Sequence, residues 1–272
     1  MPMIWNHILF SEEMIDHTEQ IINFKLDESY LIIGAQGNNL LAFVPFWSTQ
    51  NTTYKLNKDI SEENFTKLIK TISYKDKKVI SYIIGYITYY FLEKTIENYI
   101  EYFINKTQTN ETIIKTTIDT LIMKKFHNLN TEKTPVLKEF KFGVLLDKNI
   151  ETALKIINPP LADNLRNAYF HTLISLKWLF DPYGWKAKMF PSYTPLFDNK
   201  SCFTSGIDLL NEGKIIWDEI NQDSRTFTEL YNQAKIEAID FLSHLITYWE
   251  KNDELSLKTT IHLFNNLNKK AN

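Results

Sequence analysis

The fold of this chain is decided by residues 76–106, which read DKKVISYIIGYITYYFLEKTIENYIEYFINK. Apolar side chains recur there at the three- and four-residue spacing of an α-helix, from Val79 to Phe103. The spacing predicts one long helix from Asp76 to Lys106. The most apolar part, Val79 to Phe91, covers about 13 residues, which is too short to span a bilayer and is typical of a buried helix.

The sequence on either side also predicts mostly helices. Further helices are expected at residues 10–24 (with Ser11 as the N-cap), 31–45 (two short helices joined at a Gly-Asn-Asn turn), from Ser61 onward, and at 110–126, 161–180, 224–251 and 255–268. Residues 140–146 are the only segment whose sequence pattern would fit a short strand. An irregular, aromatic-rich segment is expected at residues 185–221. The chain is therefore expected to be all-α.

Composition supports a helical protein with one core. The 272 residues are 44% hydrophobic and include only 7 glycines and 8 prolines, fewer turn residues than a β-rich chain of this length needs. We expect a single all-α domain over residues 1–272, with residues 131–135 as the alternative position of a sub-boundary.

Charge and local sequence exclude several classes of function. The formal net charge is −3 and no long basic run is present, so we expect no nucleic-acid partner. The single cysteine, Cys202, forms neither an internal disulfide nor a C-x-x-C zinc pair. No secretory signal or transmembrane segment is evident, and a cytoplasmic location is expected.

Four segments of the sequence resemble motifs of a known protein family. They are Ile4-Trp5-Asn6-His7-Ile8-Leu9-Phe10, the GAQGNN run at 34–39, the GYITYYFLEKTIENY run at 85–99, and the helix with Glu111, Lys115 and Asp119. In this order they resemble the motifs I-x-T-H-x-x-F, G-x-Q-G-P-D, G-x-x-x-H-Y-x-L-D-x-x-x-H-P-Y and H-x-x-x-E of the bacterial, intracellular zinc-dependent phospholipase C family, relatives of the S1/P1 nucleases. The resemblance implies a phospholipase C/P1 nuclease-like multi-helix bundle, with three zinc ions held by imidazoles and carboxylates.

The metal-ligand positions depart from that family pattern. Of the mapped ligands only His7 is kept, while Asn39 and Glu93 stand for aspartates, Tyr89 and Glu97 for histidines, and Glu111 and Lys115 for the H-x-x-x-E pair. A lysine at a ligand position repels a metal ion. We therefore expect no trinuclear zinc.

Two states of this site remain open. In one, His7, Glu93, Glu97 and Glu111 hold a single divalent ion of harder character than structural zinc. In the other, Lys115 pairs with one of the glutamates, and Tyr89 and Asn39 fill the former metal cavity with hydrogen bonds.

Two functions follow from these expectations. The leading hypothesis is a non-catalytic pseudoenzyme with a degenerate metal site and a binding, structural or assembly role. The alternative is an enzyme that reuses the cavity, either as a phosphoester hydrolase with a reduced metal site or through metal-free acid–base catalysis by Glu93, Glu97 and Lys115. His7, Asn39, Tyr89 and Glu111 would line that cavity.

Aromatic residues allow for two kinds of partner. They are abundant, at 14% of the chain, and would suit a cavity for an apolar or lipid-like ligand, although core packing explains most of them equally well. Aromatics at residues 183–203 would suit a homo-oligomer or protein interface, or packing onto their own domain.

Overall fold

The computed structural model describes residues 3–22, 24–43, 60–72, 74–109, 111–131, 133–141, 144, 146–180 and 213–270. Within these ranges every regular element is a helix, so the prediction of an all-α multi-helix bundle is confirmed.

The long helix expected from residues 76–106 is the centre of the bundle. It is α5, Lys77–Thr107, and the side chain of its N-cap, Asp76, accepts a hydrogen bond from the Val79 amide at 3.2 Å. Residues from Val79 to Leu92 are buried on every side of the helix. A helix that is apolar all round is buried on all sides, and α5 accordingly packs against the 3₁₀ helix η1 (Gly37–Phe43) and against α1 (Ile4–Ile21), α2 (Glu28–Gly34), α6 (Glu111–Phe126), α7 (Lys148–Ile157), α11 (Ser224–Lys251) and α12 (Glu254–Lys270).

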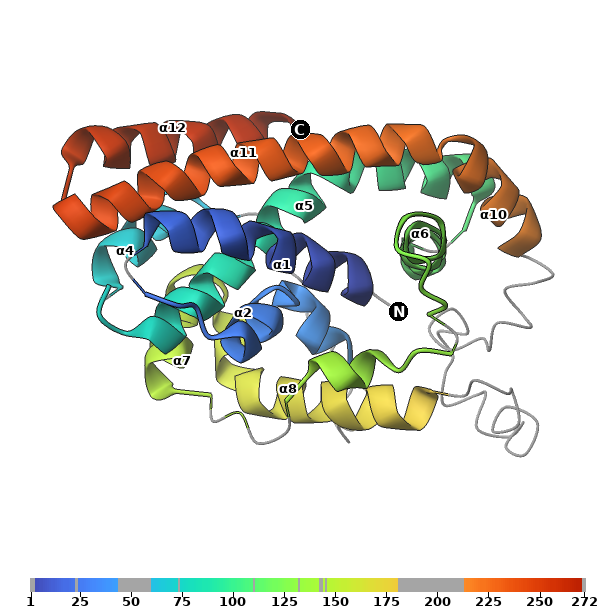
Figure 1. Ribbon diagram of the computed structural model, residues 1–272, viewed down its shortest axis with the longest axis horizontal. Coiled ribbons are helices and arrows are strands. Elements are labelled where there is room, and N and C mark those ends of the chain that lie inside the picture. The colour runs from blue at the N-terminus through green and yellow to red at the C-terminus, as the bar shows by residue number, and fades with distance from the viewer. Residues whose placement is uncertain are drawn as a thin grey trace.

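The helices form layers about α5 (Figure 1). The antiparallel pair α11 and α12 covers one side, α1 and α2 lie across the middle, and α8 (Pro159–Leu179) lies on the opposite side with α7 and the 3₁₀ helix η1 (Gly37–Phe43). The remaining elements are α4 (Glu62–Thr71), η2 (Val136–Glu139) and α10 (Gly213–Gln222). The hydrophobic core draws residues from both sides of the 131–135 segment, for example Leu92 and Leu245.

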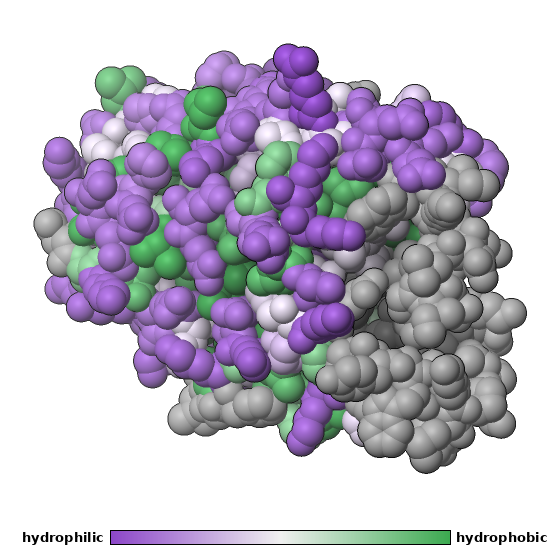
Figure 2. Space-filling model, turned by 45° about the vertical axis from the view of Figure 1, so that its right-hand side comes forward, coloured by the Kyte–Doolittle hydropathy of each residue, from purple (hydrophilic) through white to green (hydrophobic). Residues whose placement is uncertain are grey.

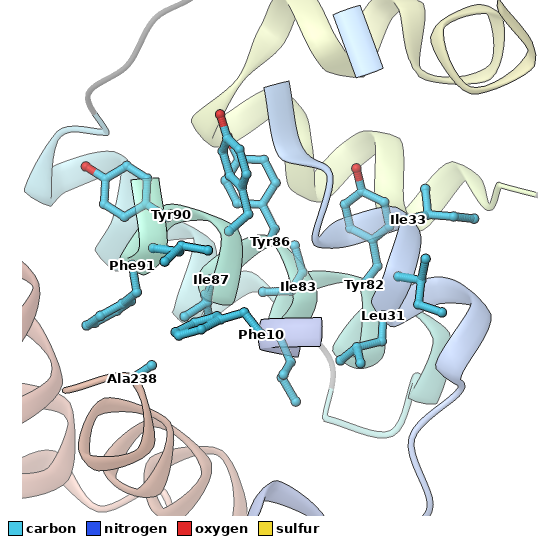
Figure 3. Packing of buried hydrophobic residues seen from close by; sticks show 14 of the residues in the cluster. Phe10, Leu31, Ile33, Tyr82, Ile83, Tyr86, Ile87, Tyr90, Phe91 and Ala238 are labelled. Atoms are coloured by element: carbon cyan, nitrogen blue, oxygen red, sulfur yellow. The ribbon is translucent and has the colours of Figure 1, made fainter. Parts of the chain in front are cut away.

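Tyrosines line one face of α5. Tyr82, Tyr86 and Tyr90 follow one another at four-residue spacing, and their hydroxyls point the same way, whereas Phe91 points toward Ala238 of α11 (Figure 3). The Tyr90 hydroxyl donates to the Asn268 side chain at 2.6 Å. The tyrosine face thus ties α5 to α12 through a hydrogen bond as well as through packing.

Two glycines allow α2 and α5 to cross with their backbones in contact. A Cβ on Gly85 would lie 2.1 Å from the Leu31 carbonyl oxygen, and a Cβ on Gly34 would lie 2.0 Å from the Tyr82 carbonyl oxygen. Any side chain at either position would force the helices apart. This close crossing brings the turn after α2, residues 35–39, against α5.

Several sequence-based expectations are confirmed at the level of helix ends. The side chain of Ser61 caps α4 by accepting from the Asn64 amide. The two short helices expected on either side of a Gly-Asn-Asn turn are α2 and η1, but they join at Ala35–Gln36, and the Gly-Asn-Asn residues form the start of η1. The long helices α6, α8, α11 and α12 lie where helical spacing placed them.

Other expectations are wrong. The first helix begins at Ile4 rather than Phe10, and Ser11 is not its N-cap but lies inside it, with the hydroxyl donating to the Ile8 carbonyl oxygen at 2.7 Å. The described residues of the 140–146 segment form no strand, and α7, which was not expected, follows them. Most of the expected irregular segment at 185–221 lies outside the described residues, up to the start of α10.

No helix among the described residues is both long and apolar enough to cross a bilayer.

Candidate functional site

The first turn of α1 is held in place by a carboxylate from α6. Asp119, which is buried, accepts hydrogen bonds from the backbone amides of Trp5 at 3.2 Å and Asn6 at 2.8 Å, and from the Asn6 side chain at 2.7 Å. These amides are among the donors that a helix leaves unpaired at its N-terminus. Burial raises the pKa of Asp119 to about 6, against the opposing effect of the hydrogen bonds from Asn6 and Trp5.

That capping directs the next residue, His7, toward α5. The His7 side chain is fully buried, and its Nε2 lies 2.9 Å from Oε1 of Glu93. A carboxylate can only accept, so Nε2 carries the proton of this hydrogen bond.

A lysine completes the cluster from α6, which Figure 1 shows nearly end-on beside the start of α1. The Lys115 ammonium donates to Oε2 of Glu93 at 2.6 Å and lies 3.0 Å from Oε1 of Glu111, one turn earlier on the same helix. We call His7, Glu93, Glu111 and Lys115 the α1–α5–α6 network. Both oxygens of Glu93 are engaged, one by the imidazole and one by the ammonium.

The network is charged. Burial on its own would raise the pKa of Glu93, but Lys115 and the hydrogen-bonded His7 outweigh burial and hold that pKa well below its usual value. Burial likewise works to lower the pKa of Lys115, and the carboxylates of Glu93 and Glu111 outweigh it, so that pKa is raised. Both groups are therefore ionised at neutral pH, which stabilises the pair but does not suit either for proton transfer.

Tyr89 adjoins the network. Its ring centroid lies 5.0 Å from that of His7, and on its other side it packs against Gly37, where the backbone has a φ of +47°. A Cβ on Gly37 would lie 2.2 Å from Cδ1 of Tyr89. Burial raises the pKa of the Tyr89 hydroxyl well above its usual value, aided by the charge of Glu93, so this hydroxyl stays neutral.

The turn around Gly37 also supplies buried polar atoms. Among the described residues, neither amide atom of Gln36 has a hydrogen-bond partner, and the same holds for Nδ2 of Asn39 and Nδ1 of His7. The hydrogen bonds expected from the side chain of Asn39 are therefore not made by its nitrogen among the described residues. Gln36 belonged to the quoted motif, but nothing in the sequence marked it as a buried, unpaired amide.

Glu97 lies one turn beyond Glu93 on α5 and has a different partner. Its carboxylate is 3.0 Å from the ammonium of Lys94, which is itself buried. The structure thus brings together His7, Glu93, Glu111 and Lys115, places Tyr89 beside them, and gives Glu97 an ion pair of its own.

These residues do not fit a trinuclear zinc cluster. Zinc requires imidazole, thiolate or carboxylate ligands converging on each ion. Among the described residues, no three His, Cys, Asp or Glu side chains are grouped so that they could hold a metal ion. The carboxylates of Glu93 and Glu111 already surround a lysine ammonium, so the charge that a metal ion would bring is supplied by the chain itself.

Outside the network, the described residues line a small apolar gap and a surface groove. An apolar gap between Phe65, Tyr90 and Phe264 measures about 10 Å³, comparable to one water molecule and too small for a lipid chain. A surface groove of about 280 Å³ between α7 and α8 is lined by the ion pairs of Arg166 with Glu151 and of Lys155 with Asp163. Its charges neutralise one another and favour no ligand class.

The exposed surface does not single out an interface. In Figure 2 the visible face is largely hydrophilic, with hydrophobic residues in separate areas. Among the described residues the large exposed apolar side chains belong to several different helices; they are Tyr102, Phe126, Phe170, Trp178, Ile236 and Leu255.

Comparison with known proteins adds no relative: no family model, no curated protein and no solved structure matches this chain. The resemblance to the zinc-dependent phospholipase C family therefore stays a prediction that rests on the four motifs.

Proposed function

We propose that this chain is a non-catalytic relative of the zinc-dependent phospholipase C family that serves as a binding or assembly protein. The proposal is supported by one observation above all. The Lys115 ammonium lies between the carboxylates of Glu93 and Glu111, at 2.6 and 3.0 Å, where the family motifs place metal ligands.

The arrangement also explains how such a chain keeps its fold without metal. A buried carboxylate that loses its cation is strongly destabilising. Lys115 supplies that cation from α6, and His7 supplies a donor from α1, so Glu93 links the consecutive helices α5 and α6 to α1, which is distant in sequence. The network thus performs a structural role that requires no bound ion.

Metal analysis tests the proposal directly. Protein purified without chelator is expected to contain far less than one equivalent of zinc, manganese or iron per chain. Stoichiometric zinc that disappears in His7→Ala would overturn the proposal, provided that the variant keeps the helical circular dichroism of the wild type.

The alternative is an enzyme that uses Glu93, Glu97 and Lys115 in the same place. Its support is the convergence of charged groups near solvent, since the side chain of Glu111 is 42% exposed. The ionised states of Glu93 and Lys115 count against acid–base catalysis, and the pairing of Glu97 with Lys94 separates it from the other two.

A panel of phosphodiesters and phospholipids decides between the two functions. The non-catalytic proposal expects rates equal to those of Glu93→Gln on every substrate. A rate that falls at least tenfold in Glu93→Gln, and is unaffected in the distant control Lys155→Ala, would establish the enzyme instead.

A further inference from the structure

Three helices begin at one end of the bundle. The Asp27 amide, at the start of α2, donates to the Ser81 hydroxyl near the start of α5 at 2.9 Å. The Asn149 side chain, at the start of α7, donates to the N-cap of α5, Asp76, at 3.0 Å. The N-terminal ends of α2, α5 and α7 therefore lie together (Figure 1), and each carries the partial positive charge of a helix N-terminus.

Exposed lysines surround these helix ends. The Lys77 ammonium lies 5.2 Å from the ring centroid of Phe24, and the Lys78 ammonium lies 5.5 Å from that of Tyr30. None of the exposed lysines at this end forms an ion pair with a described residue. We call five of them the basic patch: Lys25, Lys75, Lys77, Lys78 and Lys148.

The aspartates at this end are engaged with backbone. The side chains of Asp27, Asp76 and Asp147 accept from the amides of the helices that they cap. They form no ion pair with a lysine of the basic patch, and five lysines outnumber three aspartates. This end of the bundle is therefore positively charged, and its ammonium groups are available to a partner.

A group of carboxylates lies directly beside the basic patch. Glu28 is exposed at the start of α2, three residues after Lys25. Burial raises the pKa of Glu12 on α1, and the charges of Glu139 and Glu28 raise it further, so these three carboxylates lie near one another.

The group extends along α1 to Asp16, which is exposed one turn beyond Glu12. None of its members forms an ion pair with a described residue, and Lys138, which precedes Glu139 in the sequence, does not pair with it. We call this group the acidic patch: Glu12, Asp16, Glu28 and Glu139.

We infer that the basic and acidic patches dock on the acidic and basic patches of a second copy of this chain, forming a two-fold symmetric dimer. The inference names a partner for the proposed binding or assembly role and rests on that role. It uses no residue of the α1–α5–α6 network.

Symmetry is the argument for a second copy. In a two-fold interface the same surface of each chain faces the other, so a residue of either chain meets its complement twice. Two adjacent patches of opposite sign satisfy this condition, because a two-fold axis between them places each basic patch on the acidic patch of the other chain. The patches adjoin at Lys25 and Glu28, where such an axis would pass.

Other partners fit this surface less well. None of the large exposed apolar side chains among the described residues belongs to either patch, so no anchor for a bilayer is present there. The phosphates of a nucleic acid would be repelled by the acidic patch beside the lysines.

The dimer is expected to be weak and sensitive to salt. Electrostatic complementarity contributes more to specificity and association rate than to affinity. Salt screens exposed charges over roughly 10 Å at 0.1 M and roughly 3 Å at 1 M ionic strength. We therefore expect a dissociation constant in the micromolar to millimolar range at low salt, which rises at least about tenfold in 1 M NaCl.

The experiment is sedimentation velocity of the full chain at low salt, in a concentration series that extends into the millimolar range. One variant reverses the basic patch and another reverses the acidic patch: Lys25→Glu with Lys77→Glu and Lys78→Glu, and Asp16→Lys with Glu28→Lys and Glu139→Lys. Each variant alone should weaken the dimer at least about tenfold, because like charges now meet. An equimolar mixture of the two should dimerise as the wild type does, since both contacts again join opposite charges.

A matched control separates the patches from net charge. Three exposed, unpaired lysines outside both patches are reversed together: Lys133→Glu, Lys258→Glu and Lys269→Glu. This variant changes the net charge as much as the basic-patch variant does, and its dimer dissociation constant should stay within about twofold of the wild type. Circular dichroism checks that each variant keeps the helical content of the wild type.

Each remaining outcome has a defined meaning. A wild type that stays monomeric at every concentration, a mixture that does not dimerise, or a control that loses the dimer as the patch variants do would overturn the inference. A monomeric wild type that sediments with phosphatidylserine vesicles would assign the basic patch to a membrane and overturn it as well. If a triple variant loses its helical signal, the pairs Lys77→Glu/Lys78→Glu and Asp16→Lys/Glu139→Lys replace the triples, with the same outcomes. None of these results alters the metal analysis or the substrate panel, so the proposed function stands or falls separately.

Discussion

Replacing Glu93 with glutamine removes the one group that joins all three helices of the α1–α5–α6 network. The substitution keeps the shape of the side chain but deletes the charge that faces Lys115 at 2.6 Å and His7 at 2.9 Å. The Lys115 ammonium, 11% exposed, is left with Glu111 alone. Breaking a buried pair by removing one partner costs about 3–5 kcal/mol, which corresponds to a fall in melting temperature of roughly 6–20 °C.

The loss depends on pH with a sign that follows from Glu93. Its pKa in the folded protein lies below the ordinary value of 4.5, since Lys115 and His7 outweigh burial. Such a group contributes stability above its unfolded pKa and loses that contribution as the pH falls. The difference in free energy of unfolding between wild type and Glu93→Gln should therefore be full at pH 7 and shrink below about pH 4.5.

Urea denaturation followed by circular dichroism at several pH values measures both quantities. Glu229→Gln is the control, because it removes the same kind of charge from an exposed ion pair, with Arg225 at 2.9 Å on α11. We expect it to cost about 0.3–0.5 kcal/mol. A cost for Glu93→Gln below about 1 kcal/mol, or equal to that of Glu229→Gln, would refute the central role given to Glu93.

Three further changes test other parts of the structure. Gly85→Ala places a Cβ 2.1 Å from the Leu31 carbonyl oxygen and should cost about 3 kcal/mol or more by forcing α2 from α5; an unchanged urea midpoint would contradict the close crossing. The pKa of Asp119 is raised from 3.8 to about 6, so stability tied to its protonation is present below pH 3.8 and lost as the pH rises through 6. In urea titrations the wild type should lose about 3 kcal/mol relative to Asp119→Asn across that window, and a constant difference between the two would exclude this effect. Ser61→Ala removes the N-cap of α4 and should cost about 1 kcal/mol, whereas Ser61→Asp should not; equal thermal stability of all three proteins would argue against the cap.

The sequence predicted elements well where the signal was local. Helical spacing located α5, and short polar side chains marked its start at Asp76 and the start of α4 at Ser61. Each of these signals depends on residues within a few positions of one another, which is why a single sequence contains them.

Signals that come from distant residues were missed. The start of α1 depends on Asp119, more than 100 positions away, so the local choice of Ser11 as N-cap was wrong. α7 is short, and its N-cap, Asp147, follows a segment that resembled a strand. Tertiary contacts decided the start of α1, whereas α7 has a local cap that was overlooked, the side chain of Asp147 accepting from the Asn149 amide.

The sequence predicted which residues form the candidate site better than it predicted the contacts between them. Motif positions named His7, Glu93, Glu111 and Lys115, which do meet. The same positions also named Glu97, which pairs elsewhere. Helical spacing puts Glu93 and Glu97 on one face of α5, but it cannot tell which of them faces α6.

The capping of α1 by Asp119 has a consequence for the order in which the protein forms during translation. When α1 leaves the ribosome its first turn has no side chain of its own to satisfy its amides, because Met3 makes no cap hydrogen bond. The carboxylate that does so is synthesised after more than 100 further residues, and the Asn268 partner of Tyr90 comes later still. The nascent chain therefore carries the first turn of α1 without its capping carboxylate until residue 119 has been synthesised.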